Sequence, residues 1–408
     1  MKGDPGGGLP DLVGLALADP CSWEAINAKA ALNERLGPRR AGALLAARAG
    51  ARAGVGDPGR AFDAARELRL FAGAGPVAVA GALLPGRALG LADLGEGRIF
   101  GRSALIEAGG RVLAEHQGDE LRRLPIRPHV DPLVTGDGPG GFHWMLPGED
   151  ALALPEALAL TGPFAPGWGH ALLEFAPQLL LAEALGLPRQ VPAIIDAGLP
   201  EAHLALFRWL APGRRLVPLG AGRAARVGRL WRASAPDYWP VLRQPEVLRD
   251  LRHCSMNLPA LARLLALVPP AAATGERLYL ARPRHPRLAE PEAVAGWFAA
   301  RGFAVLRPET LSFAEQARRV RGAAMVAGAA GSQMLLAQLF GRAGQRCLLL
   351  HHPVLEETPA LTAVQAALGQ RVRVVTGRPA GPPAPLPYNQ PLTFAEDDLA
   401  AALEALDG

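Results

Sequence analysis

The sequence predicts an α/β protein, and the clearest signal is the alternation of strand-like and helical runs over residues 277–340. The runs RLYLA, FAVLR and AAMVAG are apolar and of strand length, and helix-length segments separate them. Pro291 stands near the start of the first helix and Gly302 just past its end, where these residue types are favoured. In the second helix, Ser312 and Glu315 have the spacing of a capping box. This alternation indicates βαβ units on a parallel sheet.

Length and composition favour two globular domains. The chain has 408 residues, which is more than one hydrophobic core usually organises. Hydrophobic residues make up 50% of the chain and charged residues 20%, as in ordinary globular proteins. The formal net charge is +5, and Lys2 and Lys29 are the only lysines. Because the arginines are dispersed and no run of five basic residues occurs, no nucleic-acid partner is expected.

The cysteines and the hydropathy pattern bear on the compartment. Cys21, Cys254 and Cys347 are far apart, so neither a disulfide framework nor a C-x-x-C metal pair is expected. A transmembrane helix needs roughly 18–20 uninterrupted apolar residues, and no segment of this sequence contains such a run. We therefore expect a cytoplasmic protein, and peripheral association with a membrane surface stays open.

Pattern breaks divide the chain into four parts. Residues 1–75 are expected to form a helical N-terminal extension and residues 76–268 an α/β domain. The stretch PPAAATGE consists of small residues and prolines without periodicity, and it marks the start of a second α/β domain over residues 269–386. Residues 387–408 are expected to form a C-terminal helix that could cross back onto the first domain. Within these parts, helices are expected near 168–185, 200–210, 245–268 and 359–368, and strands at 191–196, 215–219, 226–233, 346–352 and 371–376.

Several common catalytic motifs are absent from the sequence. Neither lysine follows a glycine-rich loop, so there is no Walker A site, and H-E-x-x-H, G-x-S-x-G and D-x-D do not occur. Gly73 and Gly75 precede a strand, which is the wrong order for a dinucleotide fingerprint. No metal or cofactor is therefore expected, and a nicotinamide oxidoreductase is disfavoured.

A small-residue turn over 328–332 is the first candidate for ligand binding. It joins the strand AAMVA to the helix QMLLAQLF, and it contains Gly328, Gly331 and Ser332. Glycines let a backbone approach a ligand closely, and a helix start offers N–H groups to phosphate. An alternative interpretation is a tight connection in which Ser332 caps the helix.

Charged residues follow the neighbouring strands. Arg282, Arg284, His285 and Arg287 come directly after RLYLA, where cationic side chains could hold a diphosphate leaving group. A solvated basic loop is the alternative. Glu309 lies just after the next strand and could reach a ribose, whereas Glu315 already has an explanation in the capping box.

His170 and Glu174 form a third candidate. Their spacing of four places both on one face of the helix WGHALLEFAPQLLLAEA, where a carboxylate could orient an imidazole or act as a base. A structural hydrogen bond is the alternative. His351 and His352 end another strand, but adjacent side chains diverge on an extended chain, which argues against a shared metal ion.

These motifs together resemble glycosyltransferase family 61, which includes bacterial capsule and exopolysaccharide enzymes and relatives of plant xylosyltransferase. The resemblance covers about residues 75–345, and P-E-x-L-S-F-x-E-Q at 308–316 is its most specific element. It implies a glycosyltransferase B fold of two Rossmann-like domains, with the nucleotide sugar on the C-terminal domain and the acceptor on the other. It also implies inverting transfer without a metal ion.

The resemblance assigns roles to matching positions. His170 and Glu174 become the candidates for the base or for acceptor contact. The donor candidates, with Arg287 added from the basic loop, are Arg282, Arg287, Glu309, Glu315, Gln316, Gly328, Gly331 and Ser332. Ala330 stands where the family loop has a histidine, and Leu336 is near where it has an asparagine.

We therefore expect a transferase that moves a sugar from a nucleotide donor to a glycan or lipid-linked acceptor in surface polysaccharide biosynthesis. Because two side chains of the family loop are missing, the alternative is a catalytically degenerate member that serves as a nucleotide- or glycan-binding scaffold.

Overall fold

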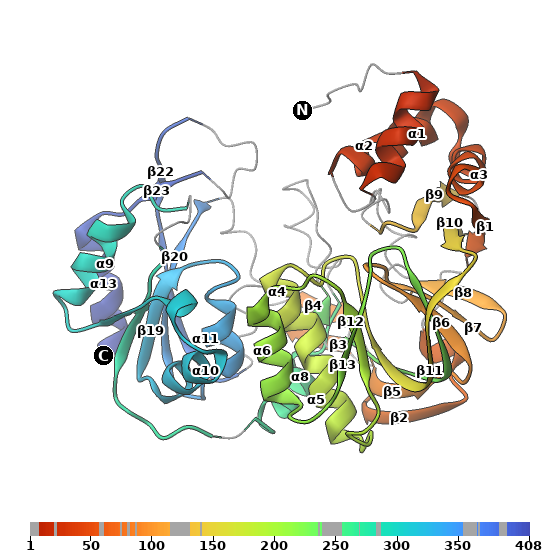
Figure 1. Ribbon diagram of the computed structural model, residues 1–408. Coiled ribbons are helices and arrows are strands. Elements are labelled where there is room, and N and C mark those ends of the chain that lie inside the picture. The colour runs from red at the N-terminus through yellow and green to blue at the C-terminus, as the bar shows by residue number, and fades with distance from the viewer. Residues whose placement is uncertain are drawn as a thin grey trace.

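The protein is mixed α/β, with one large mixed sheet and one smaller parallel sheet, each covered by helices (Figure 1). The computed structural model describes residues 8–19, 23–56, 61–73, 76–79, 82–85, 88–114, 131–138, 141–235, 237–238, 255–268, 270–282, 287–353, 365, 368–382 and 390–408. Arg284, His285 and most of the helix expected near 359–368 lie outside these residues, as do residues 245–254 of another expected helix. No helix among the described residues is long and apolar enough to cross a membrane.

Three helices open the chain: α1 (Leu9–Ala18), α2 (Trp23–Leu36) and α3 (Pro38–Ala49). The three helices lie side by side (Figure 1), and buried Leu12, Leu32 and Leu45 belong to the core between them. The expectation that helices continue to about residue 74 is wrong, because β1 (Ala51–Gly56) pairs antiparallel with β10 (Gly141–Pro147).

Glycine explains this change from helix to strand. A methyl group on Gly54 would lie 2.4 Å from Cζ2 of Trp144, and one on Gly56 would lie 2.1 Å from Cζ of Phe142. The two glycines thus make room for aromatic rings across the strand pair, and they also disfavour a helix. A further strand of this stretch, β2 (Glu67–Ala72), joins the large sheet by pairing with β5.

We call the described residues up to 268 the first half of the molecule and those from 270 on the second half. The first half contains a nine-stranded sheet. Its main path runs β13-β12-β11-β14-β6-β7-β8; off this path, β5 pairs with β14, and β2 pairs with β5. The strands β13, β12, β11 and β14 are parallel, and the others are antiparallel to their neighbours. The bounds not yet given are β5 (Leu89–Asp93), β6 (Gly97–Phe100), β7 (Leu105–Ala108), β8 (Arg111–Ala114), β11 (Asp150–Leu160), β12 (Ala193–Asp196), β13 (Leu216–Leu219) and β14 (Ala224–Ala233).

Smaller elements accompany this sheet. They are the short helix η1 (Ala61–Ala64), the pair β3 (Pro76–Val79) and β4 (Ala82–Pro85), the strand β9 (Val134–Gly138) beside β10, and the pair β15 (Asp237–Tyr238) and β16 (Ser255–Met256).

The central strand β11 has no counterpart among the sequence-based predictions. Its residues DALALPEALAL are mostly good helix formers, and Pro155 lies in the middle. Pro155 is tolerated because pairing with β12 begins only at Leu158, so the first part of the strand is hydrogen-bonded to β14 alone. Sheet context therefore overrides helix propensity here.

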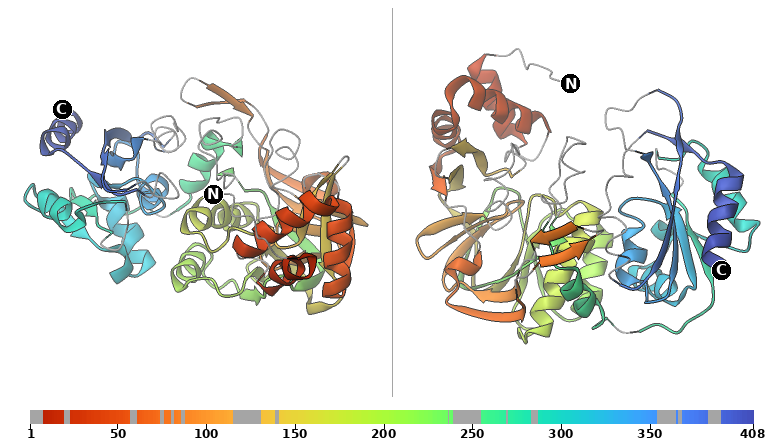
Figure 2. Two further views of the ribbon diagram at one scale, coloured as in Figure 1. Left: turned by 90° about the horizontal axis from the view of Figure 1, so that it is seen from above. Right: turned by 180° about the vertical axis from the view of Figure 1, so that it is seen from behind.

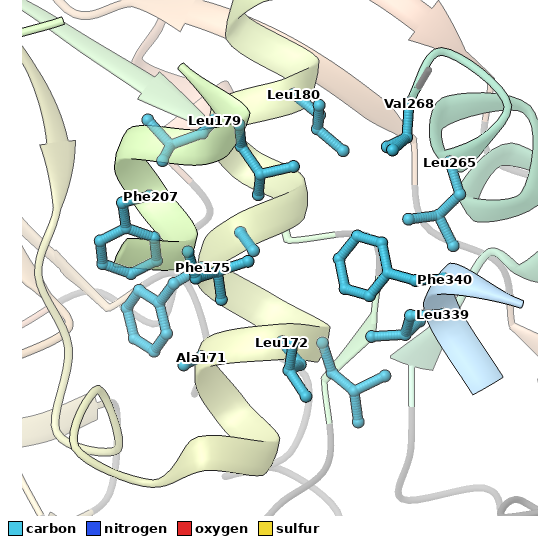
Figure 3. Packing of buried hydrophobic residues seen from close by; sticks show 14 of the residues in the cluster. Ala171, Leu172, Phe175, Leu179, Leu180, Phe207, Leu265, Val268, Leu339 and Phe340 are labelled. Carbon is cyan, nitrogen blue, oxygen red and sulfur yellow. The ribbon is translucent and has the colours of Figure 1, made fainter. Parts of the chain in front are cut away.

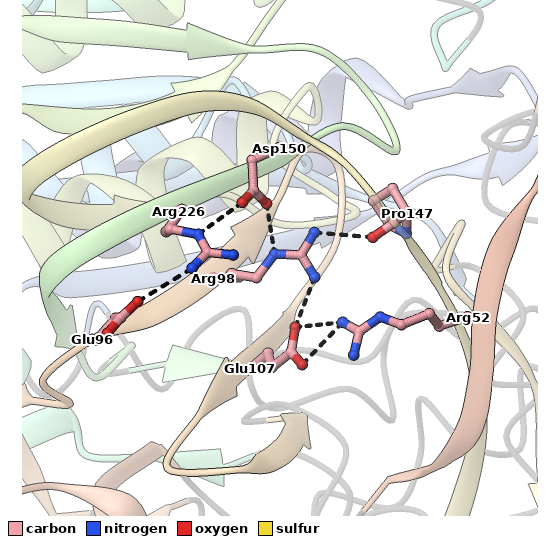
Figure 4. Close-up of polar contacts among 7 residues, drawn as sticks. All are labelled: Arg52, Glu96, Arg98, Glu107, Pro147, Asp150 and Arg226. Carbon is pink, nitrogen blue, oxygen red and sulfur yellow. Dashed lines mark hydrogen bonds and ion pairs between the residues drawn. The ribbon is translucent and has the colours of Figure 1, made fainter.

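A partly exposed ion network holds the start of β11. Asp150 accepts hydrogen bonds from Arg98 at 2.6 Å and from Arg226 at 2.9 Å (Figure 4). Burial raises the pKa of Asp150, but these hydrogen bonds outweigh it and leave the pKa below its usual value. Arg98 also pairs with Glu107, which in turn binds Arg52 of β1. The network ties β1 to the large sheet.

Helices cover the face of the nine-stranded sheet that is turned toward the second half of the molecule (Figure 1). The expected helix over 168–185 is confirmed, but it contains a π-helical turn, η3 (Ala171–Phe175), between α4 (Trp168–His170) and α5 (Ala176–Ala184). The helix expected near 200–210 is α6 (Glu201–Leu210), and α8 (Leu258–Leu265) falls within the region expected at 245–268.

The second half is built on a parallel sheet of order β18-β17-β19-β20-β21. The first strand in sequence thus lies between the second and the third, so the order reverses direction between β17 and β19. The bounds are β17 (Arg277–Leu280), α9 (Pro291–Ala299), β18 (Ala304–Leu306), η5 (Pro308–Thr310), α10 (Phe313–Gly322), β19 (Met325–Ala329), α11 (Leu335–Phe340), β20 (Arg346–His351), β21 (Arg371–Thr376), β22 (Arg378–Pro379), β23 (Leu392–Thr393) and α13 (Glu396–Asp407).

Helices lie on both faces of this sheet, as Figure 2 shows from two sides. On the outer face, α9 and α13 bury Phe298 and Leu403 with Tyr279 of the sheet. The C-terminal helix therefore does not cross back onto the first half, and Asp407 pairs with Arg346 and Arg277 of the second half instead. On the inner face, α10 and α11 face the first half.

The two halves share one buried core. Leu172 and Phe175 of the π turn belong to the same cluster as Leu339 and Phe340 of α11 (Figure 3). Aromatic edges add to it: the ring centroid of Phe313 lies 6.0 Å from Trp168, 5.4 Å from Trp209 and 5.6 Å from Phe340. The start of the helix at 168–184 is thus packed directly against the second half.

We expect Phe313→Ala to lower the free energy of unfolding by about 3–5 kcal/mol, because it leaves a cavity among three aromatic rings. Urea unfolding followed by intrinsic fluorescence measures this. Leu70→Ala is the control, since Leu70 is 57% exposed on β2, and it should change stability by less than about 0.5 kcal/mol. Equal losses in the two variants would contradict the packing of the interface.

Candidate active site

The carboxyl ends of three neighbouring strands bring most of the predicted donor residues to one edge of the second sheet. Register pairs Leu280 of β17 with Gly328 of β19, and Ala329 of β19 with Leu350 of β20. Arg282 and the turn after β19 therefore leave the sheet side by side. This is the point where the strand order reverses, and doubly wound sheets bind ligands there.

The two glycines of the turn have different structural roles. Gly331 has φ +144°, and a methyl group on it would lie 2.4 Å from Nη1 of Arg287. The same Nη1 donates a hydrogen bond to the Ala330 carbonyl at 2.5 Å, so the guanidinium lies directly on the turn. A methyl group on Gly328 would lie 3.2 Å from the Leu280 carbonyl oxygen, so this glycine permits close packing of the strand ends.

Ser332 is not a helix cap. Helix α11 begins at Leu335, and residues 331–334 form a turn closed by the Met334 N–H and the Gly331 carbonyl at 2.9 Å. The capping interpretation is therefore wrong, and a helix of six residues has little dipole to offer. The backbone N–H groups of residues 331–333 donate to no described residue, so the turn itself presents three donors.

Positive charge collects beside the turn. Burial lowers the pKa of Arg282, the positive charge of Arg287 lowers it further, and the carboxylate of Glu309 acts in the opposite direction. Among the described residues, no carboxylate forms an ion pair with Arg282. Burial and the charge of Arg287 likewise lower the pKa of His352, which follows β20. An anion bound here would relieve this crowding of charge.

His352 was not among the predicted donor residues. Its position after a strand of the same sheet was visible in the sequence, but its neighbours were not, because strand order is not written in the sequence.

The P-E-x-L-S-F-x-E-Q segment is largely a structural device. The Gln316 amide nitrogen donates to the carbonyls of Pro308 and Leu311 at 2.6 and 3.0 Å, and this fixes η5. Ser312 caps α10 by accepting the Glu315 N–H at 3.3 Å. Only Glu309 is an exposed side chain within electrostatic reach of Arg282. Donor contacts by Glu315 and Gln316 remain predictions.

His170 and Glu174 form a close pair on the π turn. Their Nδ1 and Oε1 atoms are 2.6 Å apart, and the Gln178 side chain donates to the Glu174 carbonyl at 2.9 Å. The carboxylate side chain is 3% exposed and the imidazole 19%. Glu174 thus holds Nδ1 from the buried side, while the rest of the imidazole is more accessible. Single π turns inside α-helices occur frequently at functional sites.

The His170 turn and the turn after β19 are neighbours across the two halves. A methyl group on Gly169 would lie 3.5 Å from Cβ of Ser332 and 3.3 Å from Cδ1 of Leu335. Gly169 therefore allows the backbone beside His170 to lie against the predicted donor turn. The structure brings together two groups of residues that are far apart in sequence.

Two buried carboxylates of the first half were missed by sequence reasoning. Asp196, at the end of β12, accepts the backbone N–H groups of Arg102 and of Gly162, the latter at 3.0 Å. Asp131 accepts hydrogen bonds from Ser103 Oγ and from the Ala104 and Leu133 N–H groups. Neither residue belongs to a motif, so no sequence signal indicated them. No three of the His, Cys, Asp and Glu side chains within the described ranges gather as a metal site.

The pH dependence of stability should report Asp196. Burial raises its pKa to about 7, although both N–H donors act to lower it. Because the unfolded chain has a pKa near 3.9, the contribution of Asp196 is fully present below about pH 4 and is lost as the pH rises to about 7. Urea unfolding over this range should show a fall in stability that Asp196→Asn removes, and an unchanged slope in the variant would contradict the assignment.

Comparison with known proteins agrees with this arrangement. No curated protein matches the chain. Residues 168–346 match the family model described as glycosyltransferase 61. The matched segment begins at the turn that carries His170 and includes β17 to β19 and the turn at 328–332. The match supports a glycosyltransferase activity in general, and over these residues the chain is similar to the glycosyltransferase 61 family.

Proposed function

We propose that the protein is an inverting, metal-independent glycosyltransferase of the B type. It would transfer a sugar from a nucleoside-diphosphate sugar to a hydroxyl of a glycan or lipid-linked acceptor, in the biosynthesis of surface polysaccharide. The observation that carries this proposal is the contact between the His170 turn and the turn after β19, beside Arg282. A cytoplasmic location remains a prediction.

The donor diphosphate fits the edge of the second sheet. Arg282 and Arg287 supply positive charge, and the N–H groups of residues 331–333 supply neutral donors. A diphosphate leaving group gains negative charge as its bond to the sugar breaks, and fixed positive groups stabilise that change. The positive charge of Arg287, which is unfavourable beside Arg282 in the free protein, would thus help to stabilise the negative charge of the transition state.

His170 is the better candidate for the base. Its imidazole is more accessible than the Glu174 carboxylate, and a carboxylate at Nδ1 leaves Nε2 as the proton acceptor. The acceptor oxygen attacks the anomeric carbon, and its proton passes to Nε2. The bond to the diphosphate breaks on the opposite side, and its electron pair stays on the phosphate oxygen. Glu174 stabilises the imidazolium that forms.

The second candidate is a binding scaffold. Ala330 has no polar side chain, and its carbonyl is occupied by Arg287, so the turn itself offers a ligand only backbone N–H groups and Ser332. Titration calorimetry with UDP and other nucleoside diphosphates, followed by donor hydrolysis assays, separates the two. Binding without turnover with any donor or acceptor supports the scaffold, and absence of nucleotide binding contradicts both.

Arg282→Gln should weaken binding of the nucleoside diphosphate by about 10- to 150-fold, which corresponds to about 1.5–3 kcal/mol for a charge-assisted hydrogen bond. Calorimetry measures the affinity. Arg307→Gln is the matched control, because Arg307 follows the neighbouring strand β18 but pairs with exposed Glu292. It should leave the affinity unchanged, and an equal loss in both variants would show that only net charge matters.

His170→Gln should lower turnover by about 10²–10⁴-fold, since it removes the general base. Its affinity for the nucleoside diphosphate should match that of the parent protein, because the donor contacts lie in the second half. Initial rates of transfer or donor hydrolysis, measured beside calorimetry, test this. Turnover that is unchanged in the variant would show that His170 is not the general base.

A further inference from the structure

The loop over residues 161–167 joins β11 to α4 and contacts His170 on two sides. The Phe164 ring stacks on the imidazole, with centroids 4.8 Å apart and planes at 22°. A methyl group on Gly167 would lie 3.0 Å from Cδ2 of His170. With Glu174 at Nδ1, these contacts leave the ring little freedom to rotate. The orientation of His170 therefore depends on where this loop lies.

Asp196 fixes the start of the loop. Its Oδ2 accepts the Gly162 N–H at 3.0 Å, and its Oδ1 accepts the N–H of Arg102. Arg102 has φ 59°, and it is the one non-glycine residue with positive φ in the described part of the chain. This conformation is unfavourable for a side chain larger than hydrogen. The hydrogen bond to Asp196 helps to hold it, so the carboxylate joins the 102–104 turn to the loop.

Asp131 holds the next two residues of the same turn. Its Oδ2 accepts hydrogen bonds from Ser103 Oγ at 2.9 Å and from the Ala104 N–H at 2.8 Å. Thr161 Oγ1, at the start of the loop, lies 3.5 Å from the Ser103 carbonyl oxygen. Lys29 of α2 donates to the Asp131 carbonyl at 2.9 Å. A continuous polar chain therefore runs from the N-terminal helices to the loop beside His170.

These carboxylates carry a cost that needs an explanation. Asp131 is fully buried and Asp196 is 1% exposed, and burial of a carboxylate is unfavourable unless it is well hydrogen-bonded. Apart from the Leu133 N–H, the hydrogen-bond donors to the two carboxylates belong to the 102–104 turn or to residue 162. Their hydrogen bonds thus converge on the support of one loop rather than being spread over the sheet.

We propose that Asp196 and Asp131 are positioning residues, which hold loop 161–167 so that Phe164 and Gly167 fix the imidazole of His170 for proton transfer. This inference rests on the proposed function, in which His170 is the base. The two residues act through the loop and do not touch the substrate. The N-terminal helices take part through Lys29, so they support the active site rather than form a separable extension.

The test uses histidine labelled with ¹⁵N in the full chain, with His170→Gln to assign the His170 ring signals. Asp196→Asn and Phe164→Ala should each shift the His170 ring signals and its titration curve, and should lower turnover by about 10- to 100-fold with unchanged affinity for UDP. Phe164→Tyr keeps a stacked ring and should restore both properties. Should Asp196→Asn not fold, Asp131→Asn decides the question, because Asp131 holds the same 102–104 turn and its substitution should shift the His170 ring signals too.

Asp150→Asn is the matched control, because Asp150 lies at the opposite end of β11 and binds two arginines there. It should lower stability but leave the His170 signals and turnover unchanged. His170 signals that are the same in Asp196→Asn, Phe164→Ala and the parent would overturn the proposal. Because the ring signals do not depend on transfer, they remain informative even if His170→Gln retains full turnover, which would contradict the proposed function alone.

Discussion

The His170 turn packs against the turn after β19, and this contact lies in the core that joins the two halves of the molecule. Gly169 lets the backbones of the two turns approach each other. Phe313 and Phe340 of the second half pack edge to face in the same core. Since the two halves share one buried core there, they cannot separate without exposing it. The base that we propose on one half and the anion site that we propose on the other are thereby held at a fixed distance.

The charges on the two sides of this contact are opposite in kind. The first half buries carboxylates, which are satisfied by backbone N–H groups and hold a loop in place. The second half gathers Arg282 and His352, whose pKa values are lowered by burial and by the positive charge of Arg287. The hydrogen-bonded carboxylates hold the backbone in place, whereas positive groups that lie close together favour the binding of an anion. We therefore expect buried charge to support the structure in the first half and to bind a ligand in the second half.

Local patterns in the sequence predicted the second half well and the first half in part. Strand length, Pro291, Gly302 and Ser312 place its elements, because these signals act within a few residues. The strand β11 was missed, since its alanines and leucines favour a helix and Pro155 argues against a central strand until the neighbouring strands are known. Asp196 and Asp131 were missed for a related reason: their partners are distant in sequence, and no spacing rule connects them.

Hydrogen–deuterium exchange with saturating nucleoside diphosphates tests most directly whether the two halves form one active site. We predict that a ligand which binds will slow exchange both at residues 328–335, beside Arg282, and at residues 168–175, across the contact. Binding that slows exchange at neither segment, or only on the outer face covered by α9 and α13, would contradict it.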